Sequence, residues 1–174
     1  MQGRPLNIHA LMAHQPGLLA AWWQYRNYIV RGGDLSQRDT ELLILRVAVR
    51  LGVWYEWASH VDRGLEAGLT RDEIERVKTG ASASGWSVQE TVLLQAVDQL
   101  TEQHRIEQST QEALAHHYTE KQVMDMIAIQ GVYVTLACML QTWDTDLDQH
   151  VNDRLPEDVT RAAFESEVSA PHGH

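Results

Sequence analysis

The sequence contains very little of several residue types. Among its 174 residues are one cysteine, Cys138, one phenylalanine, Phe164, and four prolines, and 14 Lys and Arg residues stand against 24 Asp and Glu residues. A single thiol cannot form an intramolecular disulfide, and we expect Cys138, within the apolar run GVYVTLACML, to be a small buried side chain. The formal net charge of −10, with no basic stripe, argues against nucleic acid and anionic membrane surfaces as partners.

Signals for export or membrane insertion are also missing. The first residues, MQGRPLNIHA, lack the long apolar core of a signal peptide. The most apolar stretch, residues 126–140, is shorter than the roughly 20 residues needed to cross a bilayer. We therefore expect a soluble cytoplasmic protein whose partner is a small molecule or another copy of the same chain.

Helix start and stop signals recur along the chain. Capping boxes, in which Ser or Thr precedes Glu or Gln by three residues, begin at Thr70, Ser87, Ser109 and Thr119, and a related form begins at Ser36. Gly52, Gly68 and Gly80 each follow a periodic segment, as is typical of helix C-termini. These signals predict helices near 17–30, 37–51, 53–67, 71–79, 88–103, 110–118 and 120–143. Because no stretch alternates as a strand does, the predicted fold class is all-α.

We divide the chain into a short N-terminal segment (1–16), one helical domain (17–150) and a polar C-terminal segment (151–174). The first segment is expected to form one short helix before Pro16. In the last segment Pro156 is expected to open a helix over EDVTRAAFESEV, either packed on a neighbour or loose, before a disordered tail, SAPHGH. Residues 80–85, GASASG, are interpreted as a flexible connector within the domain.

The remaining histidines and aromatic residues are assigned ordinary roles. His104, His116 and His117 fall on polar surfaces and are expected to be solvated, and His172 and His174 are tail residues. The tryptophans are expected to pack in the core or at an interface.

The helix predicted at 37–51 carries two polar residues on an almost entirely apolar surface. Glu41 and Arg46 therefore need partners in the interior, because burial of an unpaired charge is costly. If this helix and the next pack as a hairpin about Gly52, Glu41 lies about 16 Å and His60 about 12 Å from the turn, at similar depth.

Glu56 precedes His60 by four residues and so lies on the same helix face. Two carboxylates and an imidazole could then converge, with one carboxylate pKa raised and the imidazole able to carry a proton near neutral pH. The alternatives are an ordinary surface pair and half of a metal site, although zinc needs three or four ligands and only one histidine is in place.

The sequence also resembles a known protein family. The stretch SQRDTELLILRVAVRLGVWYEWASHVDRGLEAGLTRDEIERV is similar to the core of the carboxymuconolactone decarboxylase family, which also contains the AhpD-like alkylhydroperoxidases. GWSVQETVLLQAVDQL, YTEKQVMDMIAIQGVY and TWDTDLD extend the resemblance over roughly residues 17–150. It implies an AhpD-like helical bundle that assembles as a homo-oligomer (dimer, trimer or hexamer), with sites near subunit contacts.

The resemblance also implies site residues. In the peroxidase branch a Cys-x-x-Cys-x-x-x-His motif and an upstream glutamate form the site; here the histidine is His60, the glutamate is Glu41, and the cysteine positions hold Val53 and Glu56. Dithiol peroxidase activity is therefore not expected.

The decarboxylase side of the family fits better, with Glu41, Glu56 and His60 as the predicted catalytic residues. Arg46, Tyr133 and Trp57 are the predicted substrate-binding residues. For each of these three a structural role is the alternative: a buried ion pair for Arg46, and core packing for Tyr133 and Trp57.

The leading hypothesis is a cofactor-free lyase or isomerase that moves protons on a small lactone or keto acid, without a metal. The second is a non-catalytic small-molecule-binding or scaffold protein, which predicts a filled, salt-bridged core at Glu41, Glu56 and His60. A metal-dependent enzyme is third, and a peroxidase is last.

Overall fold

The computed structural model describes residues 5–31 and 33–168. Within these ranges every regular element is a helix and no strand occurs, which confirms the all-α prediction. The elements are α1 (Asn7–Met12), α2 (Pro16–Arg31), α3 (Gln37–Leu51), α4 (Trp54–Glu66), α5 (Arg71–Thr79), a 3₁₀ turn η1 (Gly80–Ser82), α6 (Val88–Gln103), α7 (Gln108–Leu114), α8 (Glu120–Thr142), α9 (Gln149–Asn152) and α10 (Arg161–Val168).

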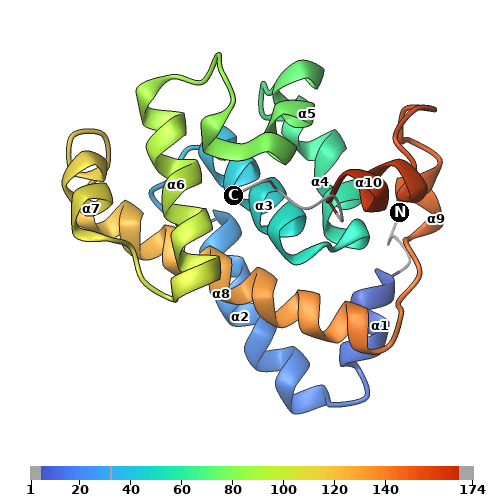
Figure 1. Ribbon diagram of the computed structural model, residues 1–174. Helices are drawn as coiled ribbons and strands as arrows, with labels where there is room; N and C mark the ends of the chain where they lie inside the picture. Colours follow the sequence, from blue (N-terminus) through green and yellow to red (C-terminus); the bar gives the residue numbers. More distant parts are fainter. Residues whose placement is uncertain (1–4, 32, 169–174) are drawn as a thin grey trace.

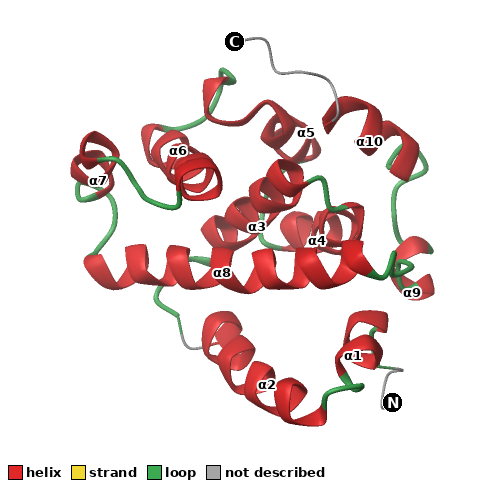
Figure 2. Ribbon diagram, turned by 60° about the horizontal axis from the view of Figure 1, so that its bottom comes forward, coloured by secondary structure: helices red, strands yellow, loops and turns green. Residues whose placement is uncertain are grey.

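Helix α3 occupies the centre of the fold. It packs against α4, α5, α6 and α8, which is why its apolar residues surround it on all sides and are almost completely buried. Helix α8 crosses the molecule with α3 and α4 on one side and α1 and α2 on the other (Figures 1 and 2). Helices from distant parts of the sequence therefore meet at α8.

Side-chain caps fix the starts of the central helices. The capping boxes at Thr70, Ser87 and Thr119 are all present, and the Ser36 hydroxyl accepts a hydrogen bond from the Asp39 amide at 3.0 Å. The box predicted at Ser109 is wrong, because α7 begins at Gln108, two residues before the predicted start at residue 110, and its N-cap residue is Glu107.

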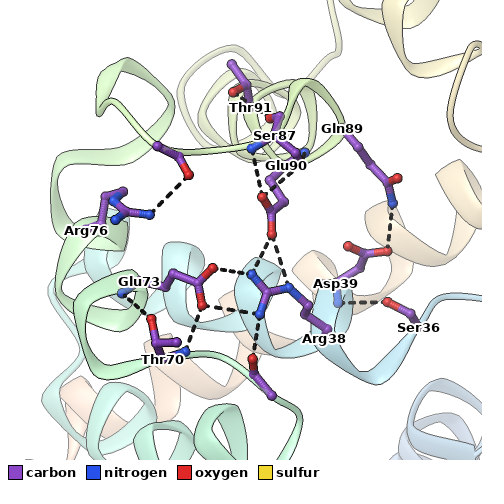
Figure 3. Close-up of polar contacts among 12 residues, drawn as sticks. Ser36, Arg38, Asp39, Thr70, Glu73, Arg76, Ser87, Gln89, Glu90 and Thr91 are labelled. Atoms are coloured by element: carbon purple, nitrogen blue, oxygen red, sulfur yellow. Dashed lines mark hydrogen bonds and ion pairs between the residues drawn. The ribbon is translucent and has the colours of Figure 1, made fainter.

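One arginine of α3 joins two of these caps (Figure 3). Arg38 Nη2 lies 2.5 Å from Glu73 Oε1 and 2.7 Å from Glu90 Oε1, so the glutamates that cap α5 and α6 also bind the first turn of α3. The same guanidinium donates to the Gly68 carbonyl at 2.7 Å. The residues that cap α5 and α6 thereby also hold these helices against α3.

Helix α8 is longer than the apolar run within it. An 18-residue window of this 23-residue helix has a mean hydropathy of 1.8, which by length and composition alone would suffice to cross a membrane. The expectation that this segment is too short is therefore wrong for the helix as a whole. Half of that window is buried in the fold, as expected for the core helix of a soluble protein. Cys138 lies on the opposite, exposed face of α8 with Gly131 and Thr135, so its predicted burial is also wrong.

The GASASG segment is held by specific contacts and is not a free connector. Gly80 begins η1 with a φ of +82°, and a Cβ at this position would lie 2.4 Å from Arg46 Cζ. The Gly80 carbonyl accepts a hydrogen bond from the Trp86 indole at 3.1 Å, and the Gly85 carbonyl accepts one from Arg76 Nη1 at 3.3 Å. Only glycine fits where the backbone passes the guanidinium of Arg46 so closely.

Both ends of the chain contribute short helices. Helix α1 ends before Pro16, as predicted. The last helix begins at Arg161 rather than after Pro156, because the Thr160 hydroxyl accepts the Ala163 amide at 3.2 Å and acts as a cap. Phe164 anchors α10 in the core of the same chain. The predicted disordered tail, with His172 and His174, lies outside the described residues, and the boundaries at 16/17 and 150/151 stay predictions.

Candidate active site

The α3–α4 hairpin brings Glu41 and His60 into contact. Gly52 makes the turn with a φ of +65°, a left-handed conformation that glycine adopts without steric cost. Across the hairpin His60 Nδ1 lies 2.6 Å from Glu41 Oε2. Glu41 and His60 therefore lie at a similar distance from the turn, as the helical rise predicts.

The other imidazole nitrogen faces three further groups. His60 Nε2 lies 3.1 Å from Tyr133 Oη on α8, 3.3 Å from Arg63 Nη1 and 3.7 Å from Glu56 Oε2 on α4. Glu41 can only accept at Nδ1, so Nδ1 carries the proton of the neutral ring. The Nε2 lone pair then accepts the hydrogen bond that the Tyr133 hydroxyl donates.

The side chains of the two glutamates, the histidine and the tyrosine are almost completely removed from water. The exposed fractions are 8% for Glu41, 4% for Glu56, 2% for His60 and 7% for Tyr133. Burial, with a smaller contribution from the Glu41 charge and against the pull of Arg63, raises the pKa of Glu56 to about 8. Burial lowers the pKa of His60, outweighing the opposite effect of Glu41, and Arg63 and Arg26 lower it further.

At neutral pH the site therefore contains a protonated carboxylic acid beside a neutral imidazole. The 3.7 Å approach of Glu56 to His60 is consequently no ion pair, because both groups are uncharged. Burial, with the nearby Glu56 and Glu41, raises the pKa of Tyr133 well above its usual value, so its hydroxyl stays protonated. An acid and a base held side by side are the requirement for moving protons on a bound molecule.

The cluster borders open space on two sides. A pocket of about 480 Å³ is lined by Glu41, His60 and Tyr133 together with Arg26, Arg63 and Glu66. A smaller one, of about 50 Å³, lies under α1 and α2 and includes Glu56, His60 and Tyr133. The larger volume lies within the range of small-molecule sites.

Arg46 lies outside both pockets, and its predicted substrate-binding role is wrong. Its Nε and Nη2 donate to the two carboxylate oxygens of Asp98 at 2.7 and 2.9 Å, and its Nη1 donates to the carbonyls of Val77 at 2.8 Å and Lys78 at 3.0 Å. The guanidinium thus joins α3 to α5 and α6, which is the structural alternative.

Trp57 also points away from the cluster. Its ring stacks on Phe164 with centroids 5.4 Å apart, and the Lys78 ammonium lies 5.3 Å from its centre. It is 1% exposed, so core packing was the correct alternative and substrate contact was the wrong one. Tyr133 is the one predicted binding residue that the structure places at the site.

Sequence reasoning missed two arginines that line both pockets, Arg63 and Arg26. Arg63 follows His60 by three residues, so helical spacing alone would have placed it on the same face. Arg26 comes from α2, and no local pattern relates it to the other residues.

The described residues contain neither the dithiol motif of the peroxidase branch nor a group of side chains arranged to bind a metal ion. Val53 and Glu56 occupy the two positions of the dithiol motif, and the chain has one cysteine in all. In the parts of the chain that the structure describes, no three His, Cys, Asp or Glu side chains are arranged so that they could hold a metal ion.

The fold and the cluster together define a helical protein with a buried cluster of acidic groups and an imidazole. The model of the carboxymuconolactone decarboxylase family matches residues 16–99, which include Glu41, Glu56 and His60. Over these residues the chain is similar to that family. No curated protein matches the chain.

Solved structures extend the likeness beyond the matched residues. A protein of unknown function from Agrobacterium tumefaciens, linked by name to the antioxidant defence protein AhpD, is 19% identical with a TM-score of 0.73, over 79% of this chain and 94% of that one. A peroxidase-related protein with an AhpD core from Ralstonia eutropha is 17% identical with a TM-score of 0.77, over 90% and 85%.

The debrominase Bmp8, solved with a tribromopyrrole, is 14% identical with a TM-score of 0.73, over 95% and 84%. At such identities these likenesses show the fold alone.

Proposed function

We propose that the protein is a cofactor-free lyase or isomerase that transfers protons on a small lactone or keto acid. The observation that carries the proposal is the buried chain Glu41–His60–Tyr133, which lines a pocket of about 480 Å³. The protonated Glu56 lines the smaller pocket, which His60 and Tyr133 also border. The similarity to the carboxymuconolactone decarboxylase family and the debrominase among the structural relatives support a catalytic role.

Each group has a defined part in the proposed chemistry. In an isomerisation the Tyr133 hydroxyl turns from His60 Nε2 to the substrate carbonyl, and the freed nitrogen removes a proton from the carbon next to that carbonyl. Glu41 stabilises the resulting imidazolium, and Glu56 donates its proton at the new position. In a decarboxylation the bond to the carboxyl carbon breaks, carbon dioxide leaves, and the electron pair stays on the substrate as an enolate. Glu56 then protonates the carbon, and Tyr133 donates a hydrogen bond that orients the imidazole.

Solvent deuterium exchange tests this proposal without knowledge of the complete reaction. A proton-transfer enzyme in D₂O exchanges hydrogens next to the carbonyl of molecules that it binds, and NMR can follow this over a panel of lactone acids and keto acids. His60→Ala should abolish the exchange, whereas His104→Ala, at an exposed histidine outside the pocket, should retain it. Equal exchange by both variants, or none by the wild-type protein, would refute the proposal.

The runner-up is a member of the family that binds a small molecule without turnover. It shares the pocket but predicts bound ligand with no exchange. A pure scaffold is disfavoured, because it predicts a filled core, whereas Glu41, His60 and Tyr133 border open space.

We further propose that the protein works as a cytoplasmic homo-oligomer. Tyr25 and Tyr28 on α2, and Met124 and Ile127 on α8, are large apolar side chains at least 46% exposed. The Tyr25 hydroxyl donates to the Ala128 carbonyl at 3.2 Å, so the two helices present these residues together. Elution as a monomer in size-exclusion chromatography at micromolar concentration would contradict this.

A further inference from the structure

The smaller pocket next to His60 has the volume of a water site. It measures about 50 Å³, whereas pockets that hold small molecules span about 300–1,000 Å³. One buried water molecule needs about 10–15 Å³ of such space, together with polar groups that bind it. The smaller pocket can therefore hold a few water molecules but not a lactone ring.

Polar groups without hydrogen-bond partners line this pocket. Glu56 is 4% exposed, and its carboxyl makes no hydrogen bond within the described residues, since Oε2 comes no closer than 3.7 Å to His60 Nε2. Trp22 is 8% exposed, and its indole Nε1 has no acceptor in the part of the chain that the structure describes. Because burial of a polar group without a hydrogen bond is costly, both groups indicate a small polar ligand in this space.

Ser59 adds a hydroxyl to the same pocket. It follows Glu56 by three residues on one face of α4 and is half-buried. Ser59 also lines a third pocket of about 130 Å³, together with the exposed His150 and Arg154. The wall between these two pockets is formed by Ser59 and Arg63, which gives water a short route from solvent.

His60 and Tyr133 line both the smaller and the larger pocket. The imidazole Nε2, which accepts from Tyr133 at 3.1 Å, therefore lies between a space of water size and a space of substrate size. Burial lowers the pKa of His60, so the ring is neutral at neutral pH. A neutral imidazole between water and a bound carbonyl compound is the arrangement of a general base that activates water.

We propose that the protein also hydrolyses lactones, with the attacking water held in the smaller pocket by Glu56, Ser59 and Trp22. The water gives a proton to His60 Nε2 as its oxygen bonds to the carbonyl carbon of a lactone in the larger pocket. The Tyr133 hydroxyl donates to the oxyanion. The ring C–O bond then breaks, the alkoxide takes the proton back from His60, and a hydroxy acid leaves. This activity goes beyond the proposed function, since it consumes water and opens the ring.

Ring opening in ¹⁸O-labelled water tests the inference. The full chain is incubated in H₂¹⁸O with γ-butyrolactone, δ-valerolactone or γ-carboxy-γ-butyrolactone, and mass spectrometry identifies the product. Hydrolysis should place one ¹⁸O atom in the carboxyl group of the hydroxy acid, at least about a hundredfold faster than without protein. Ring opening by elimination would give an unsaturated acid without label.

Variants of the smaller pocket distinguish its water from the substrate, because Ser59 and Trp22 do not line the larger pocket. Ser59→Val fills space at the wall, and Trp22→Phe removes the unpaired N–H. Each should lower the ratio of hydrolysis to deuterium exchange at least about tenfold. Trp23→Phe removes a neighbouring indole outside both pockets and should hydrolyse like the wild type. Thermal unfolding followed by circular dichroism would show that the variants are folded, and Ser59→Ala replaces Ser59→Val if it is not.

Labelled hydroxy acid that the wild type forms and both pocket variants lose supports the inference. No labelled product from any of the three lactones, unlabelled unsaturated acid alone, or wild-type hydrolysis in both variants would overturn it. Labelled product without deuterium exchange would end the proposed proton transfer and leave the hydrolysis standing. Deuterium exchange without labelled product would end the hydrolysis and leave the proton transfer standing.

Discussion

Replacement of Glu56 by glutamine should change how the stability of the protein depends on pH. The folded-state pKa of about 8 lies above the ordinary value of 4.5, so between these values the folded protein holds a proton that the unfolded chain has released. Stability contributed by this proton is therefore present at low pH and is lost as the pH rises towards 8. The carboxamide of the Glu56→Gln variant has no such proton to lose.

The lowered pKa of His60 acts in the opposite direction. Below the ordinary value of 6.5 the unfolded chain binds a proton that the buried imidazole resists, so this group costs stability as the pH falls. The two effects oppose each other between 4.5 and 6.5, and only Glu56 acts between 6.5 and 8. Over that upper window the wild type should lose about 2 kcal/mol relative to Glu56→Gln, at about 1.4 kcal/mol per pH unit.

Urea unfolding at fixed protein concentration, repeated from about pH 6 to about pH 8.5, measures this difference directly. The free energy of unfolding of the wild type should fall over the upper part of this range, whereas that of Glu56→Gln should stay nearly level. Glu66→Gln is the matched control, because Glu66 lies on the same helix but is exposed. Parallel curves for the wild type and Glu56→Gln would refute the raised pKa and the assignment of Glu56 as an acid.

Three further predictions concern other parts of the structure. Tyr133→Phe removes the donor to His60 Nε2 and should lower kcat by about tenfold at most with little change in KM, as steady-state kinetics would show. Arg46→Met removes the bidentate partner of Asp98, which keeps only the longer contact to Arg50, and should cost about 3 kcal/mol in urea unfolding, without a specific effect on ligand affinity. Phe164→Ala removes the ring stacked on Trp57 and should cost about 3–5 kcal/mol; a change under about 1 kcal/mol would mean that α10 does not pack there.

The helices were readable from the sequence because their signals are local. Ser36, Thr70, Ser87 and Thr119 begin helices by bonding amides three residues away, so spacing suffices. Ser109 has the same spacing but lies inside α7, which begins at Gln108 after Glu107, whose amide donates a hydrogen bond to the Gln99 side chain on α6. Spacing alone cannot weigh such contacts against a cap.

The candidate site likewise contains residues that local sequence signals predict and residues that they do not. Glu41 and His60 were predicted together because the turn at Gly52 and the helical rise fix their relative depth. Arg46 was misassigned, because its partner Asp98 lies 52 residues along the chain and nothing local reveals the pair. Arg26 was missed for the same reason, since only the packing of α2 beside α8 brings it to the pocket.

The protonation state of the His60 imidazole is central to the proposed proton transfer. NMR of ¹⁵N-labelled protein at about pH 7 identifies the His60 ring by comparison with His60→Gln and reports which nitrogen carries hydrogen. A neutral ring protonated at Nδ1, with Nε2 as acceptor, is the predicted result. A doubly protonated ring, or one protonated at Nε2, would contradict the arrangement of Glu41, His60 and Tyr133 as a base ready to take a proton from a bound acid.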